Sequence, residues 1–195
     1  MIDMKTTYKV FFAAILIVST FNACNKLDRL PETELTDNTF WNTESDLMNA
    51  ANRMYQQLAG YTIDNRADDN VNQGGLNQVS NGNRGVPGTS DDWRVPYQHI
   101  FTANNILEKG TKAQVSDAIK NRYFAEARFF RAYAYFNLVQ KYGNVPLILK
   151  TLGVDAPELS MPSTERLLVV QAMYDDLDFA ATWLPTRAAL PALQY

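Results

Sequence analysis

The stretch SDAIKNRYFAEARFFRAYAYFNLVQKYG, residues 116–143, carries the clearest structural pattern in this sequence. Its apolar residues recur every three or four positions, which places them along one face of an α-helix. Small alanines alternate with large aromatic rings, which suits close packing between helices, and Gly143 is typical of a helix end. The apolar stripe consists of Ile119, Tyr123, Ala127, Phe130, Ala134 and Leu138. We therefore predict one long central helix here.

A shorter helix is predicted closer to the N-terminus, over residues 43–60. Thr43 and Asp46 have the spacing of a capping box, and Gly60 is a natural end for the helix. Its apolar residues at helical spacing are Leu47, Ala51, Met54 and Leu58. This face is expected to belong to the core.

Two further helices are predicted, one on each side of the central helix. The first covers about residues 93–108, and its inner face consists of Ile100, Ala103, Asn104 and Leu107. The second runs from about residue 163 to residue 184, where Pro185 ends it. Its apolar stripe, expected to lie in the core, consists of Leu167, Val170, Tyr174, Leu177, Ala181 and Leu184. The carboxylates of Asp175, Asp176 and Asp178 are expected on the solvated side of this helix.

These helices occur in pairs joined by irregular segments, and no long alternating pattern of a β-strand is present. The fold class predicted is mainly α, with stacked helical hairpins of the tetratricopeptide kind, although the strict repeat signature is absent. Residues 144–149 read as a short extended segment. Residues 64–92 are dominated by Asn, Asp, Gly, Ser and Gln, and we predict a long irregular loop there, functional or disordered.

Composition excludes several classes of function. A net charge of −3 provides no basic face for nucleic acid. The single cysteine excludes an intramolecular disulfide, and the single histidine, His99, excludes a histidine-rich metal site. No Ser/His/Asp arrangement is recognisable, so no catalytic residue, metal or cofactor is predicted. Paired carboxylates for glycoside hydrolysis remain an alternative, but no Asp or Glu stands in an apolar setting that would single it out as a general acid.

Residues 1–23 have the layout of a secretory signal peptide. Lys5 and Lys9 make a basic start, and the apolar run VFFAAILIV at residues 10–18 is too short to span a bilayer comfortably. An N-terminal membrane anchor or a buried helix is the alternative interpretation. The run ends at Asn22-Ala23-Cys24, which resembles the bacterial lipoprotein box. That resemblance implies cleavage before Cys24 and attachment of fatty acid, such as palmitate, to its thiol. Residues 24–42 then form a lipidated tether.

Four segments in this order, behind that box, resemble the SusD/RagB family of bacterial surface lipoproteins. They are LDRLPETELTDNTFWNTESDLMNAANRMYQQL (27–58), WRVPYQHIFTANNILE (93–108), YFAEARFFRAYAYFNLVQKYGNVPLI (123–148) and MPSTERLLVVQAMYDDLDFAATWLP (161–185). The resemblance implies a fold of tetratricopeptide-like helical hairpins. Members are usually much longer than this chain, so residues 43–195 are expected to be the N-terminal helical domain of such a protein, truncated at the C-terminus.

The resemblance also implies a function. Such lipoproteins bind nutrients, usually oligosaccharides, at the outer membrane surface, and they have no catalytic activity. They sit as a lid on a TonB-dependent (SusC-like) transporter and pass the ligand down to it. This chain is therefore expected to be anchored by lipid in the outer membrane, facing the exterior. A helical-repeat scaffold lipoprotein that makes protein–protein contacts is the main alternative, and a secreted hydrolase is a third.

Candidate ligand residues follow from the same resemblance, because family sites use aromatic faces against sugar rings and polar side chains for hydroxyl groups. Trp93, at the end of the polar loop, is the aromatic candidate, and the alternative is that it only packs the start of its helix. The polar candidates are Arg94, Asp91, Asn83 and Gln98. The other large aromatic residues are expected to be structural, namely Trp41, Phe129, Phe130 and Trp183.

Overall fold

The computed structural model describes residues 40–58, 74–75, 78, 80–83, 85–86 and 88–186. All of them belong to the compact unit Asp37–Tyr195. The predicted signal peptide, Cys24, most of the tether and most of the polar loop lie outside the described residues, so those predictions stay predictions.

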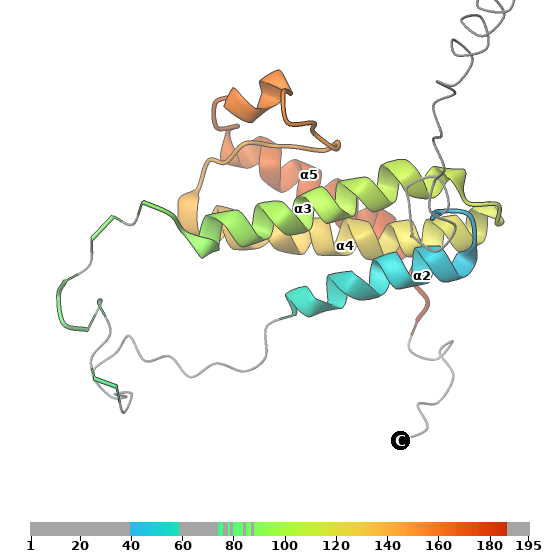
Figure 1. The fold of residues 1–195 in the computed structure, drawn as a ribbon, viewed down its shortest axis with the longest axis horizontal. Helices are drawn as coiled ribbons and strands as arrows, with labels where there is room; N and C mark the ends of the chain where they lie inside the picture. The colour runs from blue at the N-terminus through green and yellow to red at the C-terminus, as the bar shows by residue number, and fades with distance from the viewer. Residues whose placement is uncertain are drawn as a thin grey trace, which may run out of the picture. The chain divides into compact units, whose positions relative to one another are not determined.

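Four α-helices and three short 3₁₀ turns account for most of the described chain. Their order is α2 (Glu44–Asn52), η1 (Arg53–Gln57), α3 (Asp91–Lys109), η2 (Gly110–Lys112), α4 (Asp117–Tyr142), η3 (Pro157–Ser160) and α5 (Arg166–Trp183). The long helix α4 contacts α2, α3 and α5, and α3 and α4 run side by side (Figure 1). No β-strand lies among the described residues, where one antiparallel bridge joins Val145 to Thr164. The mainly α class is confirmed.

The start of α2 and the end of α4 form as their sequences predict. The Asp46 N–H donates to Thr43 Oγ1 at 3.3 Å, and the Thr43 N–H donates to Asp46 Oδ2 at 2.9 Å. This bond from the Thr43 backbone holds the pKa of Asp46 below its usual value. At α4, Ser116 caps the start, and Gly143 closes the end with a φ of 74°, a value that favours glycine.

The N-terminal helix is shorter than predicted. The α-helix α2 ends at Asn52, and the chain continues as the tighter 3₁₀ turn η1 up to Gln57. Leu47, Ala51 and Met54 are buried as expected, but Leu58 lies beyond this turn and is exposed.

The core forms on both sides of α4. One cluster joins α2 to α4 and includes Trp41, Leu47, Met54 and Phe130, and a second surrounds Ile100, Tyr135, Leu138, Val145 and Val169. Five of the six stripe residues of the central helix are buried, Ile119 being half-buried, and Ile100, Ala103 and Asn104 of α3 are buried as predicted. Among the aromatic residues expected to be structural, Trp41 and Phe130 are buried, whereas Phe129 and Trp183 are partly exposed.

The orientation of α5 differs from the prediction. Leu167 is 70% exposed and Tyr174 is 59% exposed, whereas Val169, Asp176 and Ala180 are buried. The predicted stripe is therefore not the packed face of the helix. Both faces of α5 are apolar, and hydrophobic periodicity alone does not say which of the two packs against α4.

The start of α5 also lies later than predicted. The Thr164 N–H donates to the Val145 carbonyl at 3.0 Å, which keeps residue 164 extended. The Arg166 N–H then donates to Asn144 Oδ1 at 3.0 Å, and the helix begins there. These two bonds tie the start of α5 to the exit of α4.

Candidate functional site

Three of the four predicted polar ligand residues meet at the start of α3. Arg94 Nη2 and Nε donate to Asp91 Oδ1 at 2.8 and 3.2 Å, and Arg94 Nη1 donates to Gln98 Oε1 at 3.1 Å. Helical spacing of three and four residues brings these side chains onto one face. Asn83 lies in the preceding loop, where its N–H donates to Asn81 Oδ1 at 3.0 Å, and no contact of the described residues joins it to this group.

Trp93 begins a row of aromatic side chains along α3. Its ring centroid lies 5.1 Å from that of Tyr97, and the Tyr142 ring at the end of α4 meets it edge-on at 4.9 Å. Phe101 continues the row one turn later and is 48% exposed. Trp93 is half-buried, so it packs the start of α3 and also keeps part of its ring at the surface.

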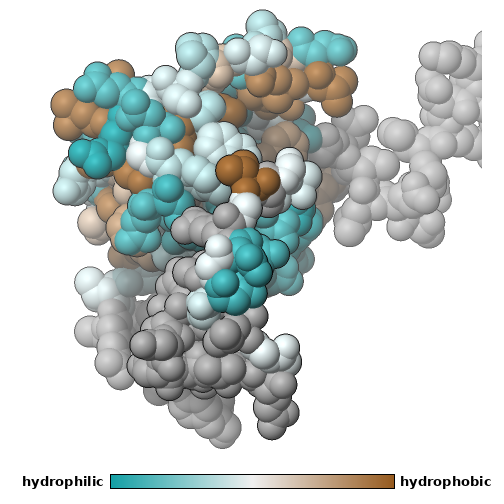
Figure 2. All heavy atoms as spheres, turned by 90° about the vertical axis from the view of Figure 1, so that its left-hand side faces the viewer, coloured by the Kyte–Doolittle hydropathy of each residue, from teal (hydrophilic) through white to brown (hydrophobic). Residues whose placement is uncertain are grey.

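A shallow groove of about 540 Å³ follows this row along the outside of α3. It is lined by Trp93, Arg94, Tyr97, Gln98, Phe101 and Thr102. Aromatic residues thus alternate with side chains that carry hydrogen-bonding groups. Figure 2 views the molecule from the side on which α3 begins, and hydrophobic and hydrophilic residues are mixed over the described part of that surface. The alternation of aromatic and hydrogen-bonding side chains along the groove suits a ligand with both apolar faces and hydroxyl groups.

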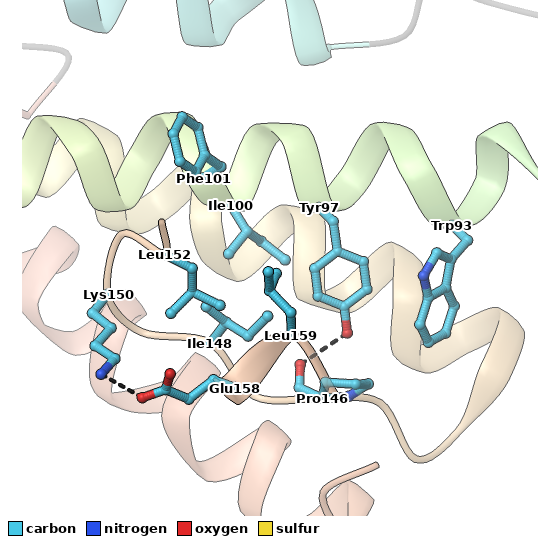
Figure 3. Close-up of a pocket in the computed structure, with 10 residues that line it drawn as sticks. All are labelled: Trp93, Tyr97, Ile100, Phe101, Pro146, Ile148, Lys150, Leu152, Glu158 and Leu159. Atoms are coloured by element: carbon cyan, nitrogen blue, oxygen red, sulfur yellow. Dashed lines mark hydrogen bonds and ion pairs between the residues drawn. The ribbon is translucent and has the colours of Figure 1, made fainter. Parts of the chain in front are cut away.

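A second cavity, of about 280 Å³, lies on the other side of the aromatic row (Figure 3). Its walls come from α3, from the extended segment 146–152 and from η3. The lining residues are Trp93, Tyr97, Ile100, Phe101, Pro146, Ile148, Lys150, Leu152, Glu158 and Leu159. The sequence did not predict this cavity, because segment 146–152 has no periodic pattern that would place it against α3.

Three polar side chains of this cavity are paired within the protein. The Tyr97 hydroxyl donates to the Pro146 carbonyl at 2.8 Å, and Lys150 Nζ lies 2.5 Å from Glu158 Oε1. Burial raises the pKa of the Tyr97 hydroxyl well above its usual value, so Tyr97 stays neutral. The hydrogen bond from Lys150 lowers the pKa of Glu158 below its usual value.

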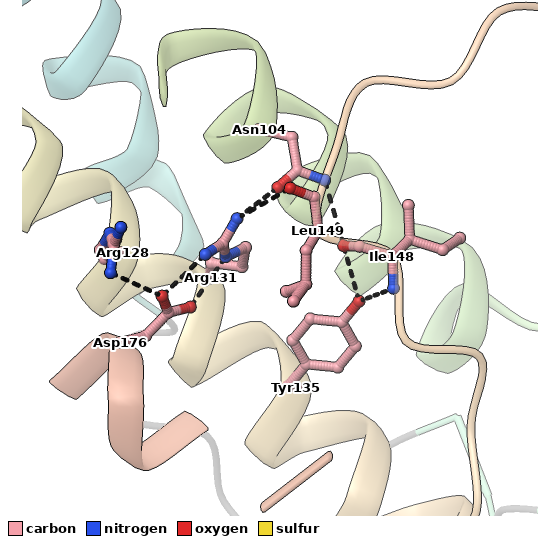
Figure 4. Close-up of polar contacts among 7 residues, drawn as sticks. All are labelled: Asn104, Arg128, Arg131, Tyr135, Ile148, Leu149 and Asp176. Atoms are coloured by element: carbon pink, nitrogen blue, oxygen red, sulfur yellow. Dashed lines mark hydrogen bonds and ion pairs between the residues drawn. The ribbon is translucent and has the colours of Figure 1, made fainter. Parts of the chain in front are cut away.

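A buried polar network lies behind the cavity (Figure 4). Arg131 of α4 donates from Nε and Nη2 to the two carboxylate oxygens of Asp176 of α5, at 2.8 and 2.7 Å. Arg131 Nη1 also donates to Asn104 Oδ1 of α3 at 2.7 Å. Asp176 is 3% exposed. One prediction was wrong here: Asp176 is not on the solvated side of its helix, because its carboxylate is held by Arg131 in the interior, where three helices converge.

The network also fixes one wall of the cavity. Asn104 Nδ2 donates to the carbonyls of Ile148 and Lys150, at 3.1 and 3.0 Å. The Tyr135 hydroxyl donates to the Ile148 carbonyl at 2.9 Å and accepts from the Ile148 N–H at 2.7 Å. Burial raises the pKa of Tyr135 to about 12. The sequence did contain an indication of such a network, because Asn104 and Arg131 are polar residues within the apolar faces of two predicted helices.

Comparison with known proteins identifies the family of this chain. The model of a SusD-like family, described as "Starch-binding associating with outer membrane", matches residues 25–190. This chain belongs to the SusD-like family. Two of its relatives are SusD-like protein P2 of Formosa agariphila, 28% identical over 195 residues, and a SusD-like protein of Bacteroides ovatus, 29% identical over 190 residues. The matches cover 91% and 85% of this chain but only 38% and 34% of the two relatives.

Solved structures of SusD-like proteins share the fold. One from Bacteroides fragilis superposes with a TM-score of 0.66 at 22% identity and covers 84% of this chain and 34% of that protein. A laminarin-binding SusD-like protein gives a TM-score of 0.60 at 24% identity, over 74% of this chain and 35% of that protein. The described helices are therefore the tetratricopeptide-like hairpins of the SusD-like fold, and the chain spans about a third of the length of these proteins.

Proposed function

We propose that this SusD-like chain binds nutrient oligosaccharides and delivers them to a TonB-dependent, SusC-like transporter in the outer membrane. Lipid on Cys24 would anchor it there, facing the cell exterior, and the ligand would be passed on without being cleaved. The observation that carries the proposal is the groove of α3, where Trp93, Tyr97 and Phe101 lie beside Arg94 and Gln98.

The groove has the two elements that recognition of a sugar requires. The C–H faces of a pyranose ring pack well on a flat aromatic ring, and Trp93 is held in place by Tyr142, so little freedom is lost when a ligand binds. The Arg94 guanidinium is oriented by Asp91 and Gln98, and its side chain is still 57% exposed. It therefore has N–H groups available for hydroxyl groups of the ligand.

The comparisons support the same class of ligand. The family description names starch, and one structural neighbour is described as laminarin-binding. Both ligands are polysaccharides, so a carbohydrate is the first class to test on this chain.

Isothermal titration of the full chain against a panel that includes starch and laminarin oligosaccharides tests the proposal. We expect Trp93→Ala to weaken binding about 5- to 150-fold, because a stacked ring contributes about 1–3 kcal/mol of binding energy at comparable sites. Trp183→Ala is the matched control, since Trp183 is also a partly exposed tryptophan but lies on α5. Equal affinities of the two variants would contradict a site in the α3 groove.

The anchor is tested separately by metabolic labelling with palmitate. The unchanged chain should incorporate label and fractionate with the outer membrane, and Cys24→Ala should do neither. Label that persists in Cys24→Ala would exclude lipidation at this cysteine.

A scaffold function is the second candidate, and the outward face of α5 favours it. Leu167, Leu168 and Tyr174 are all more than half exposed on one helix, and exposed apolar surface of this kind often marks protein contacts. Cross-linking in cells distinguishes the two functions. If Leu167→Lys abolishes a complex that Trp93→Ala leaves intact, the α5 face carries protein contacts independently of the groove.

A further inference from the structure

We infer that the cavity behind the aromatic row is a second binding site, which takes a single aromatic ring such as an aryl substituent carried by the oligosaccharide. This inference rests on the proposed function, because the oligosaccharide of that function would carry the aromatic ring. It extends that function because it predicts a preference for substituted over unsubstituted carbohydrate.

The lining of the cavity selects against a bare sugar. Apart from Lys150 and Glu158, all its lining residues are apolar or aromatic. The Tyr97 hydroxyl already donates to Pro146, and Lys150 and Glu158 are paired with each other. A sugar hydroxyl that entered would lose its hydrogen bonds to water and find few partners, namely the Trp93 indole N–H and the remaining atoms of the Lys150–Glu158 pair, in a lining that is otherwise apolar.

Part of the main chain of the cavity wall is also occupied. The N–H and carbonyl of Ile148 are both bonded to the Tyr135 hydroxyl, and the Lys150 carbonyl accepts from Asn104. These bonds also hold the wall of the cavity in place before a ligand binds. Burial of an apolar ring would therefore contribute favourably to the free energy of binding, and little of it would be lost in ordering the site.

Size and position indicate which apolar group fits. A volume of about 280 Å³ is at the small end of ligand pockets, which suits one ring with a short substituent. Trp93, Tyr97 and Phe101 line both the cavity and the groove. A sugar in the groove and a ring joined to it in the cavity would therefore contact the two sides of one aromatic row.

Titration of the full chain with phenyl and methyl glycosides of maltose and laminaribiose, and with phenol alone, tests the inference. We expect the phenyl glycoside to bind at least tenfold more tightly than the methyl glycoside of the same sugar. Leu159→Asp should abolish this difference and leave the affinity for the methyl glycoside unchanged, since Leu159 lines only the cavity and is 58% exposed. Leu167→Asp, at an exposed leucine of α5, is the matched control and should preserve the difference.

The outcomes separate this inference from the proposed function. Equal affinities for phenyl and methyl glycosides, or a preference that persists in Leu159→Asp, would overturn the aromatic site even if carbohydrate binds. If neither glycoside binds, the carbohydrate proposal fails, and the titration with phenol alone then tests whether the cavity is a binding site. Saturable phenol binding that is lost in Leu159→Asp would support a site for free aromatic compounds, and no phenol binding would overturn it.

Discussion

Two Arg–Asp ion pairs of nearly equal length occupy opposite surroundings in this molecule. Arg131 and Asp176 lie 2.7 Å apart, and their side chains are 7% and 4% exposed. Arg94 and Asp91 lie 2.8 Å apart, with side chains that are 57% and 79% exposed. The first pair is enclosed by α3, α4 and α5, whereas the second lies on the outside of α3 within its first turn.

The difference shows that burial, and not distance, determines what an ion pair does. The buried pair is costly to break, because removal of one partner leaves an uncompensated charge in the interior. The exposed pair is screened by water and contributes little to stability, but it orients a guanidinium at the edge of a groove. The buried pair therefore joins α4 to α5, and its arginine also binds Asn104 of α3, whereas we propose that the exposed pair presents Arg94 to a ligand.

The largest effect is expected at the buried pair. Asp176→Ala should lower the free energy of unfolding by about 3–5 kcal/mol, because it leaves Arg131 buried without its counter-charge. The double variant Arg131→Met with Asp176→Leu should recover part of this loss, since apolar residues of similar volume often replace a buried pair at little cost, but Asn104 Oδ1 loses its donor. Denaturation with urea measures both. A loss below 1 kcal/mol in Asp176→Ala would contradict the structural role of the pair.

The two faces of α5 provide the next test. Val169→Ala should cost about 2 kcal/mol of stability, because Val169 is completely buried and its removal leaves a cavity. Leu167→Ala, two residues earlier on the same helix, should change stability by no more than about 0.5 kcal/mol. Thermal denaturation of the two variants compares them directly. A greater loss for Leu167→Ala would show that the predicted stripe, and not Val169, faces the core.

The exposed pair should give a smaller effect, and only on binding. Asp91→Ala should leave the stability within about 0.5 kcal/mol of the unchanged chain. Its affinity for oligosaccharide should fall about 2–5-fold, because Arg94 would lose one of the two side chains that orient its guanidinium. Paired denaturation and titration experiments test this. If Asp91→Ala destabilised the protein as much as Asp176→Ala, the comparison of the two pairs would be wrong.

The smallest effect concerns pH and the half-buried His99. Burial lowers its pKa below the usual value of 6.5, so the unfolded chain binds a proton more readily than the folded one. The stability contributed by neutral His99 is therefore present above pH 6.5 and is lost as the pH falls through that value towards the folded pKa. His99→Gln should show a flatter stability profile between pH 7 and pH 5.5. A profile identical to that of the unchanged chain would exclude His99 as its cause.

The sequence predicted best what depends on neighbouring residues. The spacing of its apolar side chains, together with Gly143 at its end, was sufficient to place α4. The same local geometry brought Asp91, Arg94 and Gln98 together, because residues three and four apart on a helix are neighbours.

Features that depend on distant contacts were missed. The rotation of α5 is fixed by Asp176, whose partner Arg131 lies 45 positions earlier in the chain. The cavity wall is positioned by Asn104 and Tyr135, which bind the main chain of an irregular segment. A hydrophobic pattern records that a face is apolar, but it does not record which partner covers it.

The most direct test of a carbohydrate site in the α3 groove is fluorine NMR of the full chain labelled with fluorotryptophan. The chain has three tryptophans, Trp41, Trp93 and Trp183, and single Trp→Phe variants assign their resonances. On titration with an oligosaccharide that binds, we predict that the Trp93 resonance shifts saturably while those of Trp41 and Trp183 stay in place. A Trp93 resonance that does not move at saturating oligosaccharide would contradict the account.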